Sequence, residues 1–384
     1  MPQEINTINS KNKSFDYIES LKIINFRSHE NFNLQLSGLP LAIIGENGVG
    51  KTNILEAISL LSPGRGIRNS SFLEMVKDNN LKPWGISSNI CSNQKRYKVS
   101  TGIKESFKGR DIKINEKIVS GSSHLPEVIL ISWLTPSMDQ IFNQTPSYRR
   151  KFIDRLCAVY EKEHTKNLKI YEKLMRERNV SFKNEIIDKN WLDALELQMA
   201  NISILIAETR LKFISSLNKI LENNLDKVWP KSSLEISGFV ENLVSSWNKD
   251  KAIMVLCETL NANREKDFFS KRTSEGVHKS DLMVKEKHKR MEAKKCSTGE
   301  QKAMLMGIIL AHLELVSIHT SRYPILLLDE VLAHLDEKRR NSFFKQILNI
   351  GSQIIMTGTD ISVFSSLGKN LDIFHLNQNN LRTI

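Results

Sequence analysis

One short segment constrains the fold of this chain more than any other feature, and it runs Gly45, Glu46, Asn47, Gly48, Val49, Gly50, Lys51 and Thr52. It matches the pattern G-x-x-x-x-G-K-[ST] at every fixed position. The apolar run Leu41–Ile44 before it predicts a strand, and the apolar spacing within Thr52–Leu61 after it predicts a helix. Glycines at such a turn let backbone N–H groups surround phosphates at the positive end of the helix. The sequence therefore predicts a nucleotide-binding P-loop in an α/β fold.

A carboxylate pair near the other end of the chain supplies what a P-loop needs for hydrolysis. Asp329 and Glu330 directly follow the apolar run Ile325–Leu328, which we expect to be a buried strand. Lys51 is expected to reach the β- and γ-phosphates, and the Thr52 hydroxyl and Asp329 carboxylate are expected to hold Mg²⁺. Glu330 is suited to polarise the attacking water. Because the chain has no Asn-Lys-x-Asp element to select guanine, ATP is the expected nucleotide.

A second candidate phosphate site lies at the start of a predicted helix, Glu300–Ser317. Ser297 is a good N-cap residue and Glu300 completes a capping box, so a well-capped structural helix is one interpretation. The other interpretation rests on position, because ABC-type ATPases carry their signature motif shortly before the Asp-Glu pair. Ser297 and Gly299 would then contact the ATP of a partner subunit, since the chain's own P-loop already surrounds the phosphates from one side.

The period of the apolar residues divides the chain into four segments. We expect a flexible N-terminus at 1–15, the first part of an ATPase lobe with the P-loop and antiparallel strands at 16–145, and a helical lobe at 146–265. Residues 266–384 are expected to complete the ATPase lobe with the signature, the Walker B strand and the D-loop. The predicted fold class is α/β, an ABC-type ATPase lobe with a mixed sheet and an inserted helical lobe without a long coiled coil.

Finer expectations follow from local patterns within these segments. Strands are expected at Leu21–Phe26, Asn31–Leu36, Tyr97–Ile103, Glu127–Trp133 and Gln353–Met356. Helical patterns extend over Trp191–Leu225 and Glu337–Asn349. The basic stretch at 283–295 has little periodicity, and we expect a mobile loop there.

Charge and composition narrow the classes of protein. The chain has 55 Lys and Arg against 43 Asp and Glu, a net charge of +12. This charge fits a nucleic-acid partner and a genome biased toward Lys, Asn and Ile equally well. No run approaches the roughly 18 uninterrupted apolar residues of a membrane span, and the first fifteen residues lack the apolar core of a secretory signal. Four separated cysteines indicate reduced thiols. We therefore expect a soluble protein with no membrane partner.

Several further segments together resemble the RecF family of bacterial recombination-repair ATPases, which are related to the heads of Rad50 and the SMC proteins. Besides the P-loop, the signature and the Asp-Glu pair, they are Leu21–His29, Leu61–Arg68, Pro146–Asp154, Arg176–Asn179, Trp191–Glu196, His278–Leu282 and Leu328–Asp336. Transporter ATPases share only the first three elements, so the additional segments are what single out RecF.

The resemblance implies an ATP-dependent homodimer that binds single-stranded and gapped duplex DNA. With RecO and RecR partners it would help to load recombinase during DNA repair and replication restart, in the cytoplasm with the nucleoid. Its weak, DNA-stimulated ATPase would act as a switch, with Lys51, Glu330 and Ser297 in catalytic roles. The resemblance alone carries further residues over to the nucleotide site, namely Asn53, Arg27, Arg65 and, in the loop that communicates across the dimer, Asp336.

Two other functions remain open on the sequence. A Rad50- or SMC-like structural head would place long coiled-coil arms between the P-loop and the signature, and the interval between Thr52 and Ser297 is short for them. A nucleotide-binding subunit of a transporter would need a membrane partner. The first is separated from RecF by particle length, and the second by ATP-dependent binding of gapped DNA.

Overall fold

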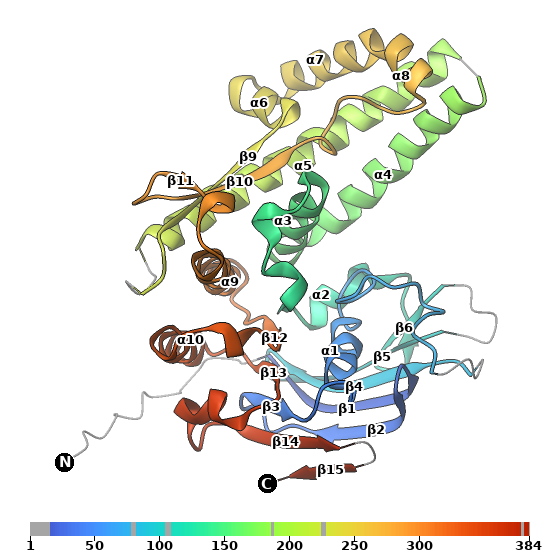
Figure 1. Cartoon of the computed structure of the whole chain (residues 1–384). Helices are drawn as coiled ribbons and strands as arrows, with labels where there is room; N and C mark the ends of the chain where they lie inside the picture. The colour runs from blue at the N-terminus through green and yellow to red at the C-terminus, as the bar shows by residue number, and fades with distance from the viewer. Residues whose placement is uncertain are drawn as a thin grey trace.

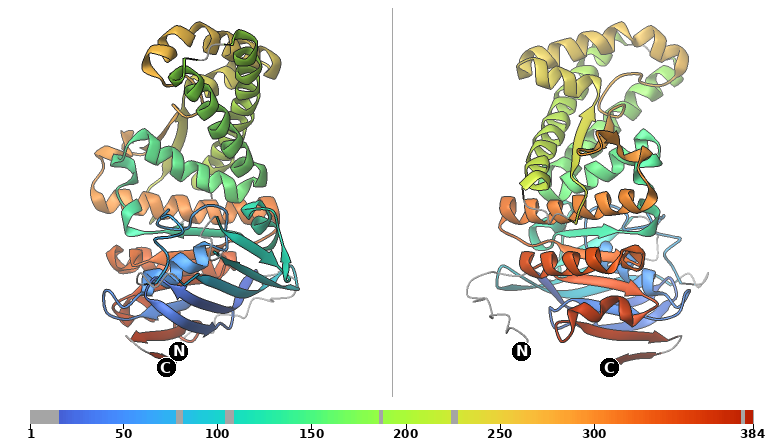
Figure 2. Two further views of the ribbon diagram at one scale, coloured as in Figure 1. Left: turned by 90° about the vertical axis from the view of Figure 1, so that its right-hand side faces the viewer. Right: turned by 60° about the vertical axis from the view of Figure 1, so that its left-hand side comes forward.

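The computed structural model describes residues 16–77, 82–103, 109–185, 188–223, 228–377 and 380–383. The segment 1–15, expected to be flexible, lies outside the described residues, as does the end of the helical pattern at Leu225. Two six-stranded sheets form the lower half of the molecule, and the helices α3 to α8 form the upper half (Figure 1). The long helix α9, Thr298–Thr320, crosses between the two halves (Figure 2).

The first sheet is antiparallel, with the strand order β2-β1-β4-β5-β6-β7. Its strands alternate buried and exposed side chains, as in β1, where Leu21 and Ile23 are buried and Lys22 and Ile24 are exposed. This pattern matches a sheet with one face on the core and one toward solvent. The strand bounds are β1 Tyr17–Phe26, β2 His29–Gln35, β4 Gly85–Ser92, β5 Lys95–Gly102, β6 Asp111–Ile114 and β7 Lys117–Ile118.

The second sheet has the order β15-β14-β3-β13-β12-β8 and is parallel except for β15. Its central strands are apolar up to Asp329 and Thr357 and are buried along their length. Helix α1 (Lys51–Ser59) packs on β8, β12 and β13, and α10 (Glu337–Ile350) packs on α9. The P-loop and the Asp-Glu pair follow β3 and β12 at the same edge. The strands are β3 Leu41–Ile44, β8 Ile131–Leu134, β12 Ile325–Asp329, β13 Ile354–Gly358, β14 Asp372–Asn377 and β15 Asn380–Thr383.

The helical lobe is built around α5, a helix of 35 residues that packs against α4, α6, α7 and α9. A three-stranded sheet, β11-β10-β9, lies beside it, with β9 at Ser232–Ser237. The described part of this lobe contains no long coiled coil, as the sequence predicts. The helices are α3 Pro146–Tyr160, α4 Lys162–Lys183, α5 Lys189–Asn223, α6 Phe239–Ser246, α7 Lys249–Ala262 and α8 Arg264–Ser270.

Two local expectations are wrong. The stretch 283–295, expected to be a mobile loop, forms a hairpin of β10 (Asp281–Glu286) and β11 (Met291–Glu292). Leu282, Val284 and Glu286 point inward and alternate with the more exposed Met283 and Lys285. The expected strand Glu127–Trp133 is split, since its first two residues belong to the short helix α2 (Leu125–Val128) and β8 begins only at Ile131. In addition, β10 pairs with β9, so this part of the segment 266–384 lies with the helical lobe.

Two arginines hold the helical lobe together from inside. The Arg178 side chain on α4 is fully buried and donates to Glu196 at 2.9 Å and to Asp267 at 2.6 Å. Arg210 on α5 donates to both oxygens of Asp154 at 2.8 Å. Arg210 also donates to Glu241 at 3.1 Å, which joins α5 to α3 and α6. The segments Arg176–Asn179, Trp191–Glu196 and Pro146–Asp154, quoted above for the family resemblance, therefore contribute buried ion pairs.

Helix α9 has the length and composition of a membrane span, with a mean hydropathy of 1.6 over its most apolar 18 residues. However, 72% of that window is buried inside the protein. It packs on α3, α5 and α10 and joins the core of the two lobes, which explains why it is apolar on all sides.

Candidate functional site

The P-loop closes on itself through Lys51. Gly48 and Gly50 have φ of 87° and 102°, in the left-handed region that favours glycine. A Cβ on Gly50 would lie 2.6 Å from the Ser28 hydroxyl oxygen, so the first turn of α1 needs glycine there for space as well. The Lys51 ammonium donates to the carbonyls of Gly45 at 2.7 Å and Glu46 at 2.9 Å. Phosphate oxygens can replace these carbonyls as acceptors of the ammonium hydrogen bonds.

Oxygen ligands for a cation converge beside the loop. The Thr52 hydroxyl donates to the Asp329 carboxylate at 2.9 Å, and Thr357 at the end of β13 donates to the same carboxylate at 2.8 Å. Asp329 lies directly opposite Thr357 in the parallel register, so the sheet itself sets this contact. A hydroxyl and a carboxylate that face each other are the oxygen donors that Mg²⁺ prefers. The residues present therefore fit the predicted metal site.

Glu330 is bound to the loop lysine. Its carboxylate lies 3.1 Å from the Lys51 ammonium, which is only 3% exposed, and its own side chain is 36% exposed. Its backbone has φ of 52°, a left-handed conformation that costs free energy for a residue other than glycine. A backbone N–H bond of 3.1 Å to the Thr357 hydroxyl holds it there. The strained turn aims the carboxylate at the place where phosphates would meet Lys51.

The predicted signature residues form an exposed helix start. The Ser297 hydroxyl accepts from the Glu300 backbone N–H, and the Glu300 carboxylate accepts from the Ser297 N–H at 3.1 Å, so the capping box is present. Lys289 in the β10–β11 hairpin also binds Glu300. Among the hydrogen bonds and ion pairs of the described residues, none joins Ser297 or Gly299 to the P-loop of the same chain.

The residues carried over by resemblance occupy different environments. Arg27 is engaged by both oxygens of the buried Glu56, at 2.8 and 3.0 Å, and by the Glu74 carbonyl at 2.7 Å. Arg65 is exposed and lies 5.9 Å from the ring of Phe72. Arg27 is therefore held to the protein interior, whereas Arg65 has a free guanidinium edge.

The remaining two carried-over residues have clear local partners. Asn53 on α1 donates to the Ser28 hydroxyl and accepts from Arg68, both at 2.8 Å. Asp336 is the N-cap of α10 and accepts from the Arg339 backbone N–H at 2.9 Å. Its side chain is exposed, so it remains accessible to a partner.

Comparison with known proteins places this geometry in a family. The model of the RecF/RecN/SMC N-terminal domain matches residues 17–382. The "DNA replication and repair protein RecF" of Rickettsia bellii is 38% identical over 360 residues, which cover 94% of this chain and 99% of the relative, and that of Rhizobium johnstonii is 37% identical over 363 residues, 93% and 96%. The chain belongs to the RecF family.

Solved structures agree with this assignment at the level of the fold. A structure of the recombination mediator RecF-ATP in the RecFOR pathway superposes with a TM-score of 0.81 at 23% identity and covers 96% of this chain and 99% of that one. An Smc head with an extended coiled coil from Pyrococcus furiosus superposes with a TM-score of 0.54 at 15% identity, covering 96% of each chain. The fold is thus that of RecF and SMC head ATPases.

The structure adds residues to this RecF-type site that the sequence pattern did not single out. Thr357 contacts Asp329 only because β13 lies beside β12, and strand order is not visible in a local pattern. His29 lies at the start of β2, and its Nε2 lies 3.1 Å from the Gly50 carbonyl. Burial lowers the pKa of His29, so the ring is neutral and donates to that carbonyl. The sequence signal that could have identified His29 is its place at the end of the segment Leu21–His29, which is one of those that resemble the RecF family.

Proposed function

We propose that this chain is an ATP-dependent DNA clamp of recombinational repair and replication restart. The proposal rests on the RecF-family relationship together with one observation, the convergence of Lys51, Thr52, Asp329 and Glu330 at a single sheet edge. The relatives are named for DNA replication and repair, and the solved relative contains ATP. The net charge of +12 suits a DNA partner, because Lys and Arg neutralise phosphates.

The chain's own groups divide the work of hydrolysis. Lys51 would leave the carbonyls of Gly45 and Glu46 for the phosphates, and this frees the carboxylate of Glu330 to accept a proton from the attacking water. Thr52 and Asp329 would hold Mg²⁺, which supplies charge neutralisation for the phosphates. The exposed Ser297 and Gly299 would complete the site of a second protomer. ATP thus bridges two protomers, and hydrolysis opens the dimer.

In this function the weak ATPase times a DNA-bound state. The dimer would contact DNA phosphates without reading sequence, favour single-stranded and gapped duplex DNA, and meet RecO- and RecR-type partners in the cytoplasm. The RecFOR pathway named for the solved relative supports the choice of partners. The described part of the helical lobe contains no long coiled coil, and so gives no observation that favours the arm-bearing structural head over this function.

The bridging role of Ser297 gives the test. Ser297→Arg should abolish ATP-dependent dimerisation in light scattering, because a bulky cation blocks an exposed helix start, while each protomer still binds ATP. The matched control is Ser366→Arg, which adds the same side chain at another exposed serine. Binding of gapped DNA, measured with and without ATP at two salt concentrations, should weaken only in the first variant. A Ser297→Arg protein that dimerises normally with ATP contradicts the proposal.

A further inference from the structure

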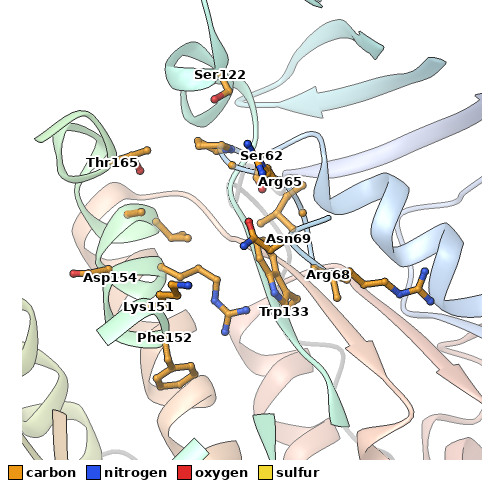
Figure 3. A pocket seen from close by; sticks show the side chains of 18 of the residues that line it. Ser62, Arg65, Arg68, Asn69, Ser122, Trp133, Lys151, Phe152, Asp154 and Thr165 are labelled. Carbon is orange, nitrogen blue, oxygen red and sulfur yellow. The ribbon is translucent and has the colours of Figure 1, made fainter. Parts of the chain in front are cut away.

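A large cavity separates the ATPase lobe from the helical lobe. Its volume is about 1480 Å³, and its walls are the loop after α1, the strand β8 with the residues that follow it, and the facing sides of α3 and α4. Figure 3 shows Arg65 and Asn69 on the loop side, Lys151 and Asp154 on the helix side, and Trp133 between them. Thr52 and Asp329 mark one end of the cavity, but the described residues that line it include neither Lys51 nor any glycine of the P-loop.

The cavity contains a cation without a counter-charge. The Arg155 guanidinium lies 4.6 Å from the ring centre of Trp133 and 5.6 Å from that of Phe152. Its hydrogen bond is to the Met138 sulfur at 3.4 Å, and no carboxylate of the described residues forms an ion pair with it. Burial lowers the pKa of Arg155 to about 9. An uncompensated charge in such a place is unfavourable, and an anion would relieve it.

Other cations line the same walls. Arg110 donates to the carbonyls of Leu60 at 2.7 Å and Ser62 at 3.3 Å, and burial lowers its pKa to about 10. Lys151 and Lys169 are exposed, and no ion pair of the described residues involves either. With Arg155 and Arg65, the lining therefore offers five positive charges that have no carboxylate partner among the described residues.

The acidic residues of the lining do not offset this charge. Asp154 is bound by Arg210 at 2.8 Å and by His164 at 2.9 Å, and neither of these partners is among the residues that line the cavity. Asp329 is engaged by Thr52 and Thr357. Glu172 is exposed to solvent. The free charge that faces the cavity is thus mainly positive.

The cavity also has flat apolar walls. Phe72, Trp133, Tyr148 and Phe152 all line it. A ligand that is planar on one side and anionic on the other matches this combination, and a nucleotide is such a ligand, because bases stack on aromatic rings and guanidinium planes. The volume exceeds that of an ordinary small-ligand pocket, so a base with its sugar and phosphate fits.

We propose that this interlobe cavity binds one nucleotide unit of a single DNA strand, with its phosphate at Arg155 and Lys151 and its base against the aromatic walls. The inference rests on the proposed DNA-binding function and adds where an unpaired base would be held. It also gives a reason for a preference for gaps, since a paired base cannot leave the duplex without an unstacking cost. The nucleotide at the P-loop would adjoin this site at the end of the cavity that Thr52 and Asp329 line, because the lining omits Gly45–Lys51.

The experiment measures affinity for a labelled oligo-dT by fluorescence anisotropy, using the full chain with ATP at two salt concentrations. Arg155→Met should lower the affinity at least about tenfold, because it removes a charged hydrogen-bond donor, and Lys151→Glu should lower it and reduce the salt slope by about one. The matched control Lys345→Glu, an exposed lysine on α10, should bind as wild type does. The melting temperature of Arg155→Met should equal or exceed that of the wild type, since a half-buried charge without a carboxylate partner is removed.

The outcomes separate this proposal from the function on which it rests. If the wild type does not bind oligo-dT at all, the DNA-binding function fails. If the wild type binds but Arg155→Met and Lys151→Glu bind equally well, only the cavity proposal fails. A lower melting temperature of Arg155→Met with unchanged binding by Lys151→Glu also overturns it, because Arg155 is then structural. Free dTMP that binds as tightly as the oligomer would show a mononucleotide site instead of a DNA-strand site.

Discussion

The sheet edge that carries Lys51, Thr52, Asp329 and Glu330, here called the nucleotide edge, and the interior of the helical lobe both contain paired charges, but with different roles. In the lobe, Arg178 and its partners Glu196 and Asp267 are almost completely buried, and each charge has a counter-charge. At the edge, the ammonium of Lys51 is bonded to its own loop and to the half-exposed Glu330. The first set is complete without a ligand. The second can exchange its partners for phosphates.

Apart from Asp267, both sets lie in segments by which the sequence resembles the RecF family, so the resemblance alone does not separate a stabilising residue from a catalytic one. The two kinds of residue differ in burial and in whether their removal leaves a partner charge without water. Removing one member of the closed set strands a charge away from water, whereas removing one member of the open set lets water enter. Three experiments test this contrast.

The largest effect is expected inside the helical lobe. Arg178→Met keeps the apolar stem but leaves Asp267 buried without its cation, so the free energy of unfolding should fall by about 3–5 kcal/mol. Urea denaturation followed by circular dichroism measures it. The control is Lys173→Met on the same helix, which loses an exposed pair with Glu177 and should cost less than about 1 kcal/mol. Equal stability of the two variants would show that the buried ion pairs contribute no more to the free energy of unfolding than the exposed pair does.

At the nucleotide edge, we expect a large loss of ATP affinity and only a small loss of stability. Lys51→Ala should lower the affinity for ATP about 10–100-fold, because one or more hydrogen bonds from a charged donor to phosphate are lost. Its unfolding free energy should stay within about 1 kcal/mol of the wild type, since water can satisfy the carbonyls of Gly45 and Glu46. Titration with a fluorescent ATP analogue measures the first quantity. Lys345→Ala is the control, and a large loss of stability in Lys51→Ala would break the contrast.

A smaller effect should appear as a pH dependence of the helical lobe. Burial lowers the pKa of His278 to about 4, and its Nε2 donates to the Thr273 carbonyl while its Nδ1 accepts from the Tyr171 hydroxyl at 2.6 Å. Below the unfolded pKa of about 6.5 the unfolded chain takes up a proton that the folded chain does not, so stability is full above pH 6.5 and declines toward pH 4.

The size of that decline is about 1–2 kcal/mol after allowance for partial exposure of the ring. Urea unfolding at pH 7.5, 5.5 and 4.5 measures it, and His278→Gln should flatten the additional decline relative to the wild type. An identical pH profile in the two proteins would assign the acid sensitivity to other groups.

The local sequence predicted the strand before the P-loop, the strand that ends at Asp329 and the capping box at Ser297, because each is encoded within a few neighbouring residues. The roles of these residues toward a nucleotide stay predictions. Contacts between residues far apart in the sequence could not be predicted from such local patterns. The contact of Thr357 with Asp329 depends on strand order, and the ion pair of Arg178 with Asp267 joins residues far apart in the chain.

The basic stretch 283–295 was predicted wrongly for a related reason. Its inward-facing residues include Glu286, whose carboxylate accepts from the Lys289 backbone N–H, so a charged side chain occupies a buried strand position. Strand β9, which pairs with β10, is itself short and partly polar. Without knowledge of that partner, the alternation looks like a solvated charge run.

The order of the parallel sheet has one more consequence. The chain leaves the sheet at β8 and returns at β12, and these strands are immediate neighbours, with Ile131 opposite Ile325. An excursion between adjacent strands can be lengthened or exchanged without disturbing their pairing. The same sheet can therefore carry lobes of different length between these two strands, and this junction is where a designer would graft one.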